Sequence, residues 1–358
     1  MKNQKRIRDY GIIIGSMKTG KRNSITDVEG IKVGHVTLDK DNIKTGVTAV
    51  LPHAGNLFKE KVFAAAHVIN GFGKTTGLVQ IEELGTIETP IILTNTLSVG
   101  IASDALIAYM LDKNDDIGLT TGTVNPVVCE CNDGYLNDIR GRHIKKEHVL
   151  KALENADVEF EEGSVGAGTG MSCYKLKGGI GTASRIITLD GNEYTVGAFV
   201  LTNMGQKRDL IIDSRFVGRI IEKIDETKDL EEDKGSIIII LASDIPMTHR
   251  QLKRISKRSV VGLSRTGSYI GNGSGEIVIS FTTANRFSHY KKEDIFEMKM
   301  IHENNMDLVF RAVAECTEEA ILNSLITANT TIGRDGNIRK SLKEYMHILL
   351  EKKISAIL

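Results

Sequence analysis

The chain has 358 residues, no formal net charge at pH 7 and 41% hydrophobic residues. This length and apolar content supply a sizeable core and exclude a disordered chain, while the balanced charge argues against a dedicated nucleic-acid surface. No stretch is long and apolar enough to span a bilayer, and the run at 12–14 is too short for a signal-peptide core. We therefore expect a cytoplasmic protein with no membrane partner.

Cysteine and histidine patterns give no sign of a metal site. The four cysteines include one Cys-x-Cys and no second pair, so we interpret them as small buried hydrophobic residues of a reducing compartment. The nine histidines form neither an H-x-x-x-H nor an H-E-x-x-H pattern. The first 22 residues are basic, which predicts a solvated terminal tail.

The first quarter of the chain predicts two strands and a helix. Residues 31–36 alternate as a strand does, and residues 46–51 are its expected partner. Residues 59–70 place apolar side chains at helical spacing, which predicts a helix that ends at Gly71. The glycine-rich loop 71–77 contains Gly-Lys-Thr, but Val68 stands where a P-loop requires glycine, so we reject a nucleotide site there.

The next segment predicts strands at 90–94 and 124–131 and helices at 101–111 and 145–156. The second strand carries Glu130 near its end, and a turn follows at 132–138 that is rich in amides and acids and contains Tyr135. Polar groups at strand ends line clefts in layered α/β folds, so this turn is a candidate part of a functional site.

Small residues dominate the stretch 163–185, which indicates close approach of the backbone to a substrate or a neighbouring layer. A strand predicted at 194–202 ends at Asn203, and a charged, solvated loop covers 222–234. Beyond residue 236 we predict a basic helix at 248–263, a strand at 277–281, a long helix at 298–325 and a last helix from residue 342.

The charged loop leads directly into Gly235-Ser236 and an aliphatic run at 237–241, which has the composition of a strand buried on both faces. A serine hydroxyl there can attack the preceding glycine carbonyl, which no side chain hinders. Hydrolysis of the resulting ester would leave Ser236 as a new N-terminus, whose amine can act as base for its own hydroxyl. The alternative is that Gly-Ser is an ordinary turn before a strand.

Motifs spread in order from residue 25 to residue 336 carry a family resemblance. They are Ile25-Thr26-Asp27-Val28 with Val33-Gly34-His35, Glu88-Thr89-Pro90-Ile91 with Thr94-Asn95-Thr96 and Ser98-Val99-Gly100, Asn132-Asp133-Gly134-Tyr135-Leu136-Asn137-Asp138, Gly235-Ser236, Ala242-Ser243-Asp244-Ile245-Pro246, Gly262-Leu263-Ser264-Arg265-Thr266-Gly267, and Asn272-Gly273-Ser274-Gly275-Glu276. In these motifs the chain resembles the DmpA-type L-aminopeptidase/D-esterase/amidase family, which includes the β-aminopeptidases.

The resemblance implies a four-layer α/β/β/α sandwich made as an inactive precursor. The precursor would cleave itself between Gly235 and Ser236 into a long chain, 1–235, and a short chain, 236–358, that together form one structural domain. It further implies a homotetramer, no cofactor and no metal. The activity implied is a serine aminopeptidase or amidase that releases N-terminal residues from short peptides, amides or esters.

The resemblance also suggests roles for individual residues. Ser236 is the expected nucleophile, and Ser274 with Glu276 would relay or orient its proton, with the Ser236 amine as the competing base. Tyr135 and Asn203 would donate to the oxyanion of the tetrahedral intermediate. A further candidate, Glu130, would hold the substrate ammonium. The structural alternatives are a turn at 274–276, loop contacts for Tyr135 and Asn203, and a surface ion pair for Glu130.

The chain departs from the family pattern at Lys74, where the family has an acid in a Gly-x-Gly-Glu loop. This departure implies a shift of specificity towards acidic or uncharged substrates.

Two other functions stay open at this point. One is an uncleaved, non-catalytic relative that binds a ligand or scaffolds an oligomer. The other is an acyltransferase of the ornithine acetyltransferase type, although that nucleophile is a threonine.

Overall fold

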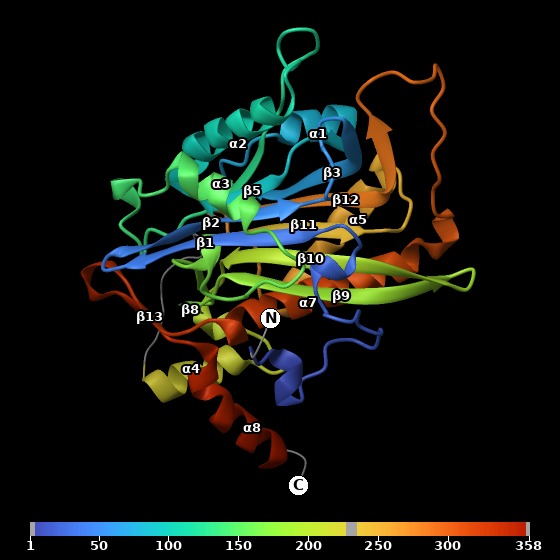
Figure 1. The fold of residues 1–358 in the computed structure, drawn as a ribbon. Helices are drawn as coiled ribbons and strands as arrows, with labels where there is room; N and C mark the ends of the chain where they lie inside the picture. Colours follow the sequence, from blue (N-terminus) through green and yellow to red (C-terminus); the bar gives the residue numbers. More distant parts are fainter. Residues whose placement is uncertain (1–3, 227–234, 356–358) are drawn as a thin grey trace.

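Two β-sheets face each other in the middle of the molecule, and helices cover the outer side of each (Figure 1). The structure is a computed structural model that describes residues 4–226 and 235–355. The smaller sheet has the strand order β1 (Lys32–Lys40), β2 (Ile43–Leu51), β5 (Ile91–Asn95), β6 (Val127–Cys131). The larger sheet has the order β4 (Thr86–Ile87), β3 (Glu60–Gly71), β12 (Gly275–Ser288), β11 (Ser236–Ser243), β10 (Asn192–Asn203), β9 (Ile180–Leu189).

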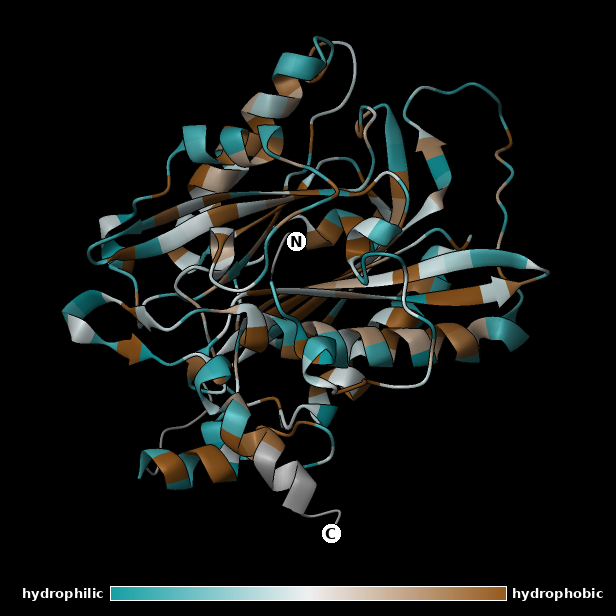
Figure 2. Ribbon diagram, turned by 60° about the horizontal axis from the view of Figure 1, so that its bottom comes forward, coloured by the Kyte–Doolittle hydropathy of each residue, from teal (hydrophilic) through white to brown (hydrophobic). Residues whose placement is uncertain are grey.

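Three apolar clusters separate the layers. The helices α2 (Val99–Lys113) and α3 (Lys146–Glu154) pack on the smaller sheet, and a second cluster fills the space between the sheets. The larger sheet packs on α5 (His249–Ser256), α6 (Ser259–Arg265) and the long α7 (Met306–Thr327). Figure 2 shows this as hydrophobic segments along the strands in the interior and hydrophilic ones in the outer loops. The predicted four-layer α/β/β/α sandwich is therefore confirmed.

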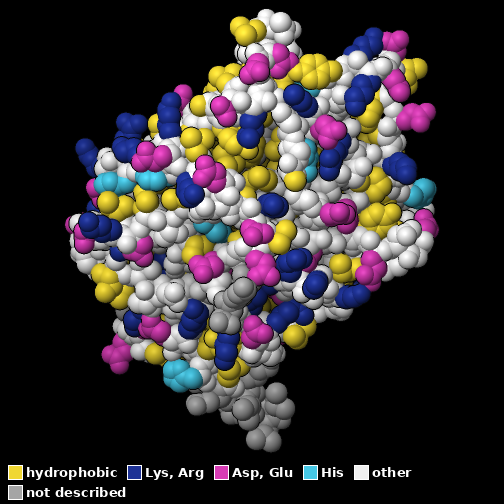
Figure 3. Space-filling view, in the orientation of Figure 1, with side chains coloured by type: hydrophobic (Ala, Val, Ile, Leu, Met, Phe, Trp, Pro, Cys, Tyr) yellow, Lys and Arg dark blue, Asp and Glu magenta, His cyan; other side chains and the backbone are white. Residues whose placement is uncertain are grey.

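The remaining elements lie around this core. They are α1 (Leu78–Leu84), α4 (Val217–Asp225), α8 (Met346–Ser355), the hairpin of β7 (Ser172–Cys173) with β8 (Leu176–Lys177), and the hairpin of β13 (Thr331–Ile332) with β14 (Ile338–Arg339). Among the described residues, no helix combines the length and apolar content that a bilayer crossing requires. Both charge signs are interspersed on the face drawn in Figure 3, as expected for a chain without net charge.

The central strand β11 is buried on both faces, as its aliphatic composition predicts. Ile237, Ile239 and Leu241 face the helices, whereas Ile238 and Ile240 face the smaller sheet. The strand pairs antiparallel with β10 on one side and parallel with β12 on the other. A parallel pair with both faces covered is the environment in which a continuous aliphatic run is favoured.

The helix predicted at 59–70 is wrong, because this segment is strand β3 and Gly71 ends a strand. Val62, Ala64 and Ala66 alternate into the core between the sheets, and the strand pairs with β12. Apolar residues at helical spacing suggested a helix, but strand pairing and burial of both faces overrode that local pattern.

Other boundaries also differ from the prediction. The helix at 248–263 is two helices, α5 and α6, and the long helix begins at Met306 and not at 298. Strand β9, in the stretch rich in small residues, was not predicted. The charged loop 222–234 begins inside α4, and its part at 227–234 lies outside the described residues.

The prediction of a solvated N-terminal tail is wrong for residues 4–22. Ile7 is fully buried, Arg6 forms an ion pair with Glu162 at 2.6 Å, and Arg8 forms one with Glu319 at 2.6 Å. The basic residues of this arm thus neutralise buried carboxylates, which the sequence spacing does not reveal because the partners lie far along the chain.

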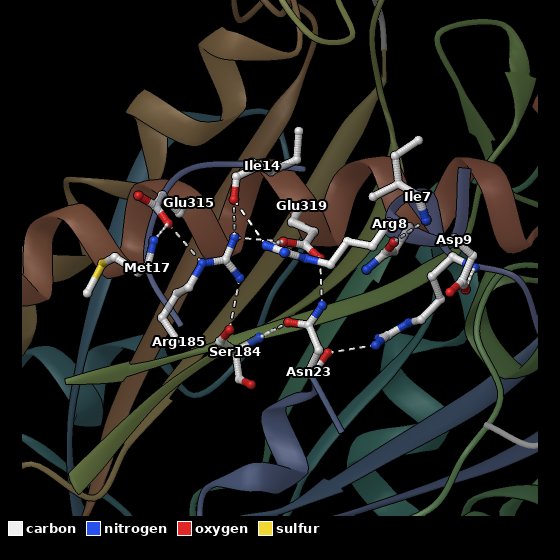
Figure 4. A network of polar contacts seen from close by, with 12 residues as sticks. Ile7, Arg8, Asp9, Ile14, Met17, Asn23, Ser184, Arg185, Glu315 and Glu319 are labelled. Atoms are coloured by element: carbon white, nitrogen blue, oxygen red, sulfur yellow. Dashed lines mark hydrogen bonds and ion pairs between the residues drawn. The ribbon is translucent and has the colours of Figure 1, made fainter. Parts of the chain in front are cut away.

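The carboxylates of α7 are also bound by a buried arginine on β9, as Figure 4 shows. Arg185 is fully buried, and its guanidinium contacts Glu315 at 2.9 Å and Glu319 at 2.6 Å. It also donates to the Ile14 carbonyl at 2.7 Å. This network ties the N-terminal arm, the larger sheet and α7 together.

We expect Arg185→Met, made in a Ser236→Ala background to keep one chain, to lower the free energy of unfolding by about 3–5 kcal/mol, since it leaves buried carboxylates without their partner. Equilibrium urea unfolding measures the change. The control Arg286→Met removes the exposed pair with Glu60 and should cost about 1 kcal/mol or less. Equal effects of the two changes would contradict a structural role for the buried network.

Candidate active site

Ser236 is the first residue of β11 and is held between two neighbouring strands. Its partner in β10 is Asn203, and its partner in β12 is Gly275. The side chain is nearly buried, at 7% exposure, and its hydroxyl interacts with the thiol of Cys131 at the end of β6. The nucleophile candidate therefore lies between the two sheets, at the edge where β11 begins.

The preceding Gly235 is fixed by its surroundings. Its carbonyl oxygen accepts a hydrogen bond from the backbone N–H of Gly275 at 3.1 Å. A Cβ at this position would overlap the Asn203 carbonyl oxygen and come within 2.5 Å of the Met204 Cα. Only glycine fits here without a backbone shift, and the carbonyl before Ser236 is already polarised by an N–H donor.

Asn203 shares the sheet face of Ser236, because directly opposite residues of an antiparallel pair point to the same side. Its Oδ1 accepts the backbone N–H of Ser172 at 2.9 Å, which assigns the orientation of the amide. The opposite end of the amide, Nδ2, is a donor available to an oxygen near Ser236.

Glu130 is buried, at 4% exposure, and is not the surface ion pair that was the structural alternative. Its carboxylate accepts the backbone N–H of Lys74 at 2.8 Å and the hydroxyl of Thr96. A Cβ added at Gly73 would lie 3.4 Å from the Ile277 side chain on β12 and 3.6 Å from this carboxylate. The loop 71–77 therefore connects Glu130 with the start of β12, beside the Ser236 junction.

Ser274 and Glu276 meet, as their spacing predicts, through a hydrogen bond from the serine hydroxyl to the carboxylate. Glu276 pairs with Ile237, so its side chain lies on the helix-facing side of the larger sheet, whereas Ser236 faces the smaller sheet. In the described part of the chain, the Ser236 hydroxyl makes no hydrogen bond to Ser274. The pair thus flanks the junction from the opposite face.

The structure does not bring Tyr135 into direct contact with Ser236. Its side chain is 41% exposed, and the Arg339 guanidinium lies 3.4 Å from the ring centroid. Arg339 in turn donates to the Ser172 hydroxyl at 3.1 Å. Tyr135 is therefore linked to Asn203 through Arg339 and Ser172.

Several neighbours of the site were not found from the sequence. Thr96 binds Glu130, and Ser172 binds Asn203. Thr96 lies in one of the motifs that carry the resemblance and just past a strand end, but no role was assigned to it. Ser172 acts through its backbone N–H, for which the sequence carries no signal.

The cysteines behave as predicted: all four are free and buried. Burial, and then the charge of Glu130, raises the pKa of the Cys131 thiol well above its usual range. Cys131 is thus a neutral neighbour of Ser236 and not a competing nucleophile.

The site combines a serine at the start of a buried strand, an amide donor on the same sheet face and a buried carboxylate nearby. These groups are the ones that a hydrolase with a serine nucleophile requires.

The fold is shared with solved structures. One is the PH0078 protein from Pyrococcus horikoshii OT3, 53% identical with a TM-score of 0.92 and covering 98% of this chain and 99% of that one. Another is the L-aminopeptidase D-Ala-esterase/amidase from Ochrobactrum anthropi, described as a prototype for the serine aminopeptidases and a variant of the Ntn hydrolase fold. It is 33% identical with a TM-score of 0.89, covering 98% of this chain and 99% of that one.

The sequence profile of peptidase family S58 matches residues 23–339, and the chain belongs to this family. The β-peptidyl aminopeptidase BapA of Sphingosinicella microcystinivorans is 37% identical, covering 97% of this chain and 94% of that protein. These findings confirm the DmpA-type resemblance and identify the chain as a hydrolase of the aminopeptidase class. Neither the non-catalytic relative nor the acyltransferase is favoured by them.

Proposed function

We propose that the chain cleaves itself between Gly235 and Ser236, and that Ser236 is then the nucleophile of an aminopeptidase or amidase acting on short peptides, amides and esters. The observation that carries this proposal is the position of Ser236. It opens a central strand, follows a carbonyl held by the Gly275 N–H, and shares a sheet face with the Asn203 amide.

In the cleavage step, the Ser236 hydroxyl attacks the Gly235 carbonyl, and its proton passes to the departing backbone nitrogen. The Gly275 N–H is placed to stabilise the oxyanion on the Gly235 oxygen, because it already donates to that oxygen at 3.1 Å. The C–N bond breaks as the ester forms, which frees the Ser236 amine. Water then hydrolyses the ester, which leaves a carboxylate on Gly235 and restores the Ser236 hydroxyl. The products are the chains 1–235 and 236–358.

In turnover, the Ser236 amine takes the proton of its own hydroxyl as the oxygen attacks the substrate carbonyl. The Asn203 Nδ2 donates to the oxyanion, the amine returns the proton to the leaving group, and water resolves the acyl-enzyme. Ser274 and Glu276, on the opposite side of the junction, would orient the amine and tune its basicity. Tyr135 would be a second donor to the oxyanion through its hydroxyl, with Arg339 packed on its ring.

In the same proposal, the Glu130 carboxylate binds the ammonium group of the substrate. This carboxylate is buried, lies one residue before the cysteine that contacts Ser236, and is oriented by Lys74 and Thr96. A buried carboxylate needs a partner of opposite charge, which a free substrate amine supplies. Two relatives are β-peptide aminopeptidases by name, so both α-amino and β-amino acyl amides belong in a substrate panel.

The proposal also includes a cytoplasmic homotetramer that uses no cofactor. Exposed apolar side chains on β3 and α1 offer a surface at which copies can meet; they are Val68, Val79 and Leu84.

Acid quenching during turnover of an aminoacyl ester should trap the acyl group on the chain that begins at Ser236, as seen by intact mass. A matched control is Ser243→Ala, a buried serine at the other end of β11, which should keep the adduct. Turnover with an adduct on the chain 1–235, or with none under any quench time, would contradict Ser236 as the nucleophile.

We expect Glu130→Gln to lower kcat/KM for substrates with a free amine by about 10–100-fold, mainly through KM, since it removes a charge-assisted hydrogen bond. Steady-state kinetics on aminoacyl anilides measures this. Glu88→Gln, at a buried glutamate bound to Lys61 instead, should leave KM unchanged. An unchanged KM in the Glu130 variant would remove it from the ammonium site.

In this proposal Lys74, beside Glu130, sets the preference of the enzyme for the charge of the first substrate residue. Its backbone is fixed on Glu130, while its ammonium is exposed 4.7 Å from the Phe72 ring centroid, next to the place of the substrate amine. A positive charge there favours an acidic first residue and disfavours a basic one.

Lys74→Glu should therefore lower the ratio of kcat/KM for acidic over basic first residues by about 10-fold at low salt, and less at high salt. Competition between paired substrates measures the ratio. Lys113→Glu, at a lysine that likewise lies over an aromatic ring, Tyr109, should leave it unchanged. Equal ratios in wild type and Lys74→Glu would exclude Lys74 as a specificity residue.

A further inference from the structure

Lys177, at the end of β8, is a fully buried lysine whose ammonium contacts only backbone carbonyls. It donates to the oxygens of Gly168 at 2.9 Å, Met171 at 3.0 Å and Gly178 at 2.8 Å. Among the described residues, no carboxylate forms an ion pair with it. Burial lowers its pKa to about 7, while Asp39, Cys173 and Asp133 act in the opposite direction. A buried ammonium is costly, so its contacts require an explanation.

The Met171–Ser172 peptide group explains one of these contacts. Its carbonyl oxygen accepts from Lys177 and also from the N–H of Gly178 at 3.2 Å. The N–H at its other end, on Ser172, is the donor to Asn203 Oδ1 at 2.9 Å. A peptide group is planar, so fixing its carbonyl also fixes the direction of its N–H. A cation on the oxygen further strengthens that N–H as a donor.

The hairpin brings these groups together. Lys177 and Ser172 are directly opposite each other in the β7–β8 pair, which is closed by Tyr174 and Lys175, both with positive φ. Lys177 therefore belongs to the same β7–β8 hairpin as Ser172, whose backbone N–H binds Asn203. The path from ammonium to amide runs through one peptide group and two hydrogen bonds.

We propose that Lys177 is a positioning residue for catalysis, which acts through the Met171–Ser172 peptide to hold the Asn203 amide with its NH₂ end towards Ser236. This inference rests on the proposed role of Asn203 in binding the oxyanion. Without Lys177 the Met171 carbonyl keeps only the longer bond from the Gly178 N–H, so the peptide group is held less firmly. The Ser172 N–H then fixes the Asn203 amide less well when the oxyanion forms.

A purely structural role would have different consequences. A lysine that only closes the loop 166–178 would, when replaced, lower stability without a selective effect on kcat. A positioning role lowers kcat with little change in KM, because the Asn203 donor acts on charge that develops only in the transition state. The effect must also depend on Asn203.

The test compares Lys177→Met and Lys177→Gln with wild type, with rates given per mole of the cleaved chain. We expect kcat to fall by about 10–100-fold for Met and by less for Gln, which keeps two donors, with KM changed by about 3-fold or less. In an Asn203→Ala background, Lys177→Met should add about 2-fold or less, since the interaction is already lost. The control Lys61→Met removes a buried lysine bound to Glu88 and should not change kcat.

Each other outcome overturns the proposal. A wild-type kcat in the Lys177 variants, or a loss that multiplies with that of Asn203→Ala, would assign Lys177 a structural role only. Failure of both variants to fold would do the same. Absence of any aminopeptidase activity in cleaved wild type would contradict the proposed function itself, whereas activity that ignores Lys177 would contradict this inference alone.

Discussion

The candidate active site depends on the pairing and burial of strand β11. The strand is paired along its length with β10 and β12 and is buried on both faces by two separate apolar clusters. Its first residue is therefore as firmly placed as its middle. A cut just before Ser236 would free an amine without releasing the strand, because residues 237–243 keep their pairing and burial. A nucleophile on such a strand costs no further ordering when substrate binds.

The two faces of the larger sheet divide the candidate chemistry. The face towards the smaller sheet carries Ser236 and Asn203 and is next to Glu130, so the hydroxyl, a donor for the oxyanion and a partner for the substrate amine converge there. The opposite face carries Glu276 with Ser274 bonded to it. The backbone nitrogen of Ser236 lies in the plane of the sheet between these two faces. In the proposed mechanism the amine freed there by cleavage is the base.

Local sequence patterns predicted an element correctly where the pattern matches the burial of that element in the folded protein. The aliphatic run at 237–241 predicts a strand buried on both faces, and residues 31–36 with 46–51 predict the β1–β2 hairpin, since each pattern reflects its own burial. Strand β3 was mistaken for a helix because its apolar residues also fit helical spacing, and the pairing with β12 that decides between the two is not visible locally. The basic N-terminal arm was mistaken for a tail because its buried partners, such as Glu162 and Glu319, lie far along the chain.

In the candidate site, too, contacts between residues far apart in the chain could not be predicted from the sequence. Ser236, Asn203 and Glu130 were proposed from their places at strand ends together with the family resemblance, and Ser274 with Glu276 from their spacing together with the same resemblance. Tyr135 was proposed for the oxyanion site on the same grounds, and that role stays a prediction; the packing of Arg339 on its ring could not be read from the sequence. Lys177 gave no signal in the sequence, because its ammonium contacts backbone carbonyls, and these are present at every residue.

The most direct test of the account is the intact mass of the purified protein under denaturing conditions, beside that of Ser236→Ala. The account predicts two chains in wild type, 1–235 and 236–358, and one chain of 358 residues in the variant. A wild-type chain that stays whole while it hydrolyses aminoacyl amides, or a variant that is still cut before residue 236, would contradict the claim that Ser236 is the self-cleaving nucleophile.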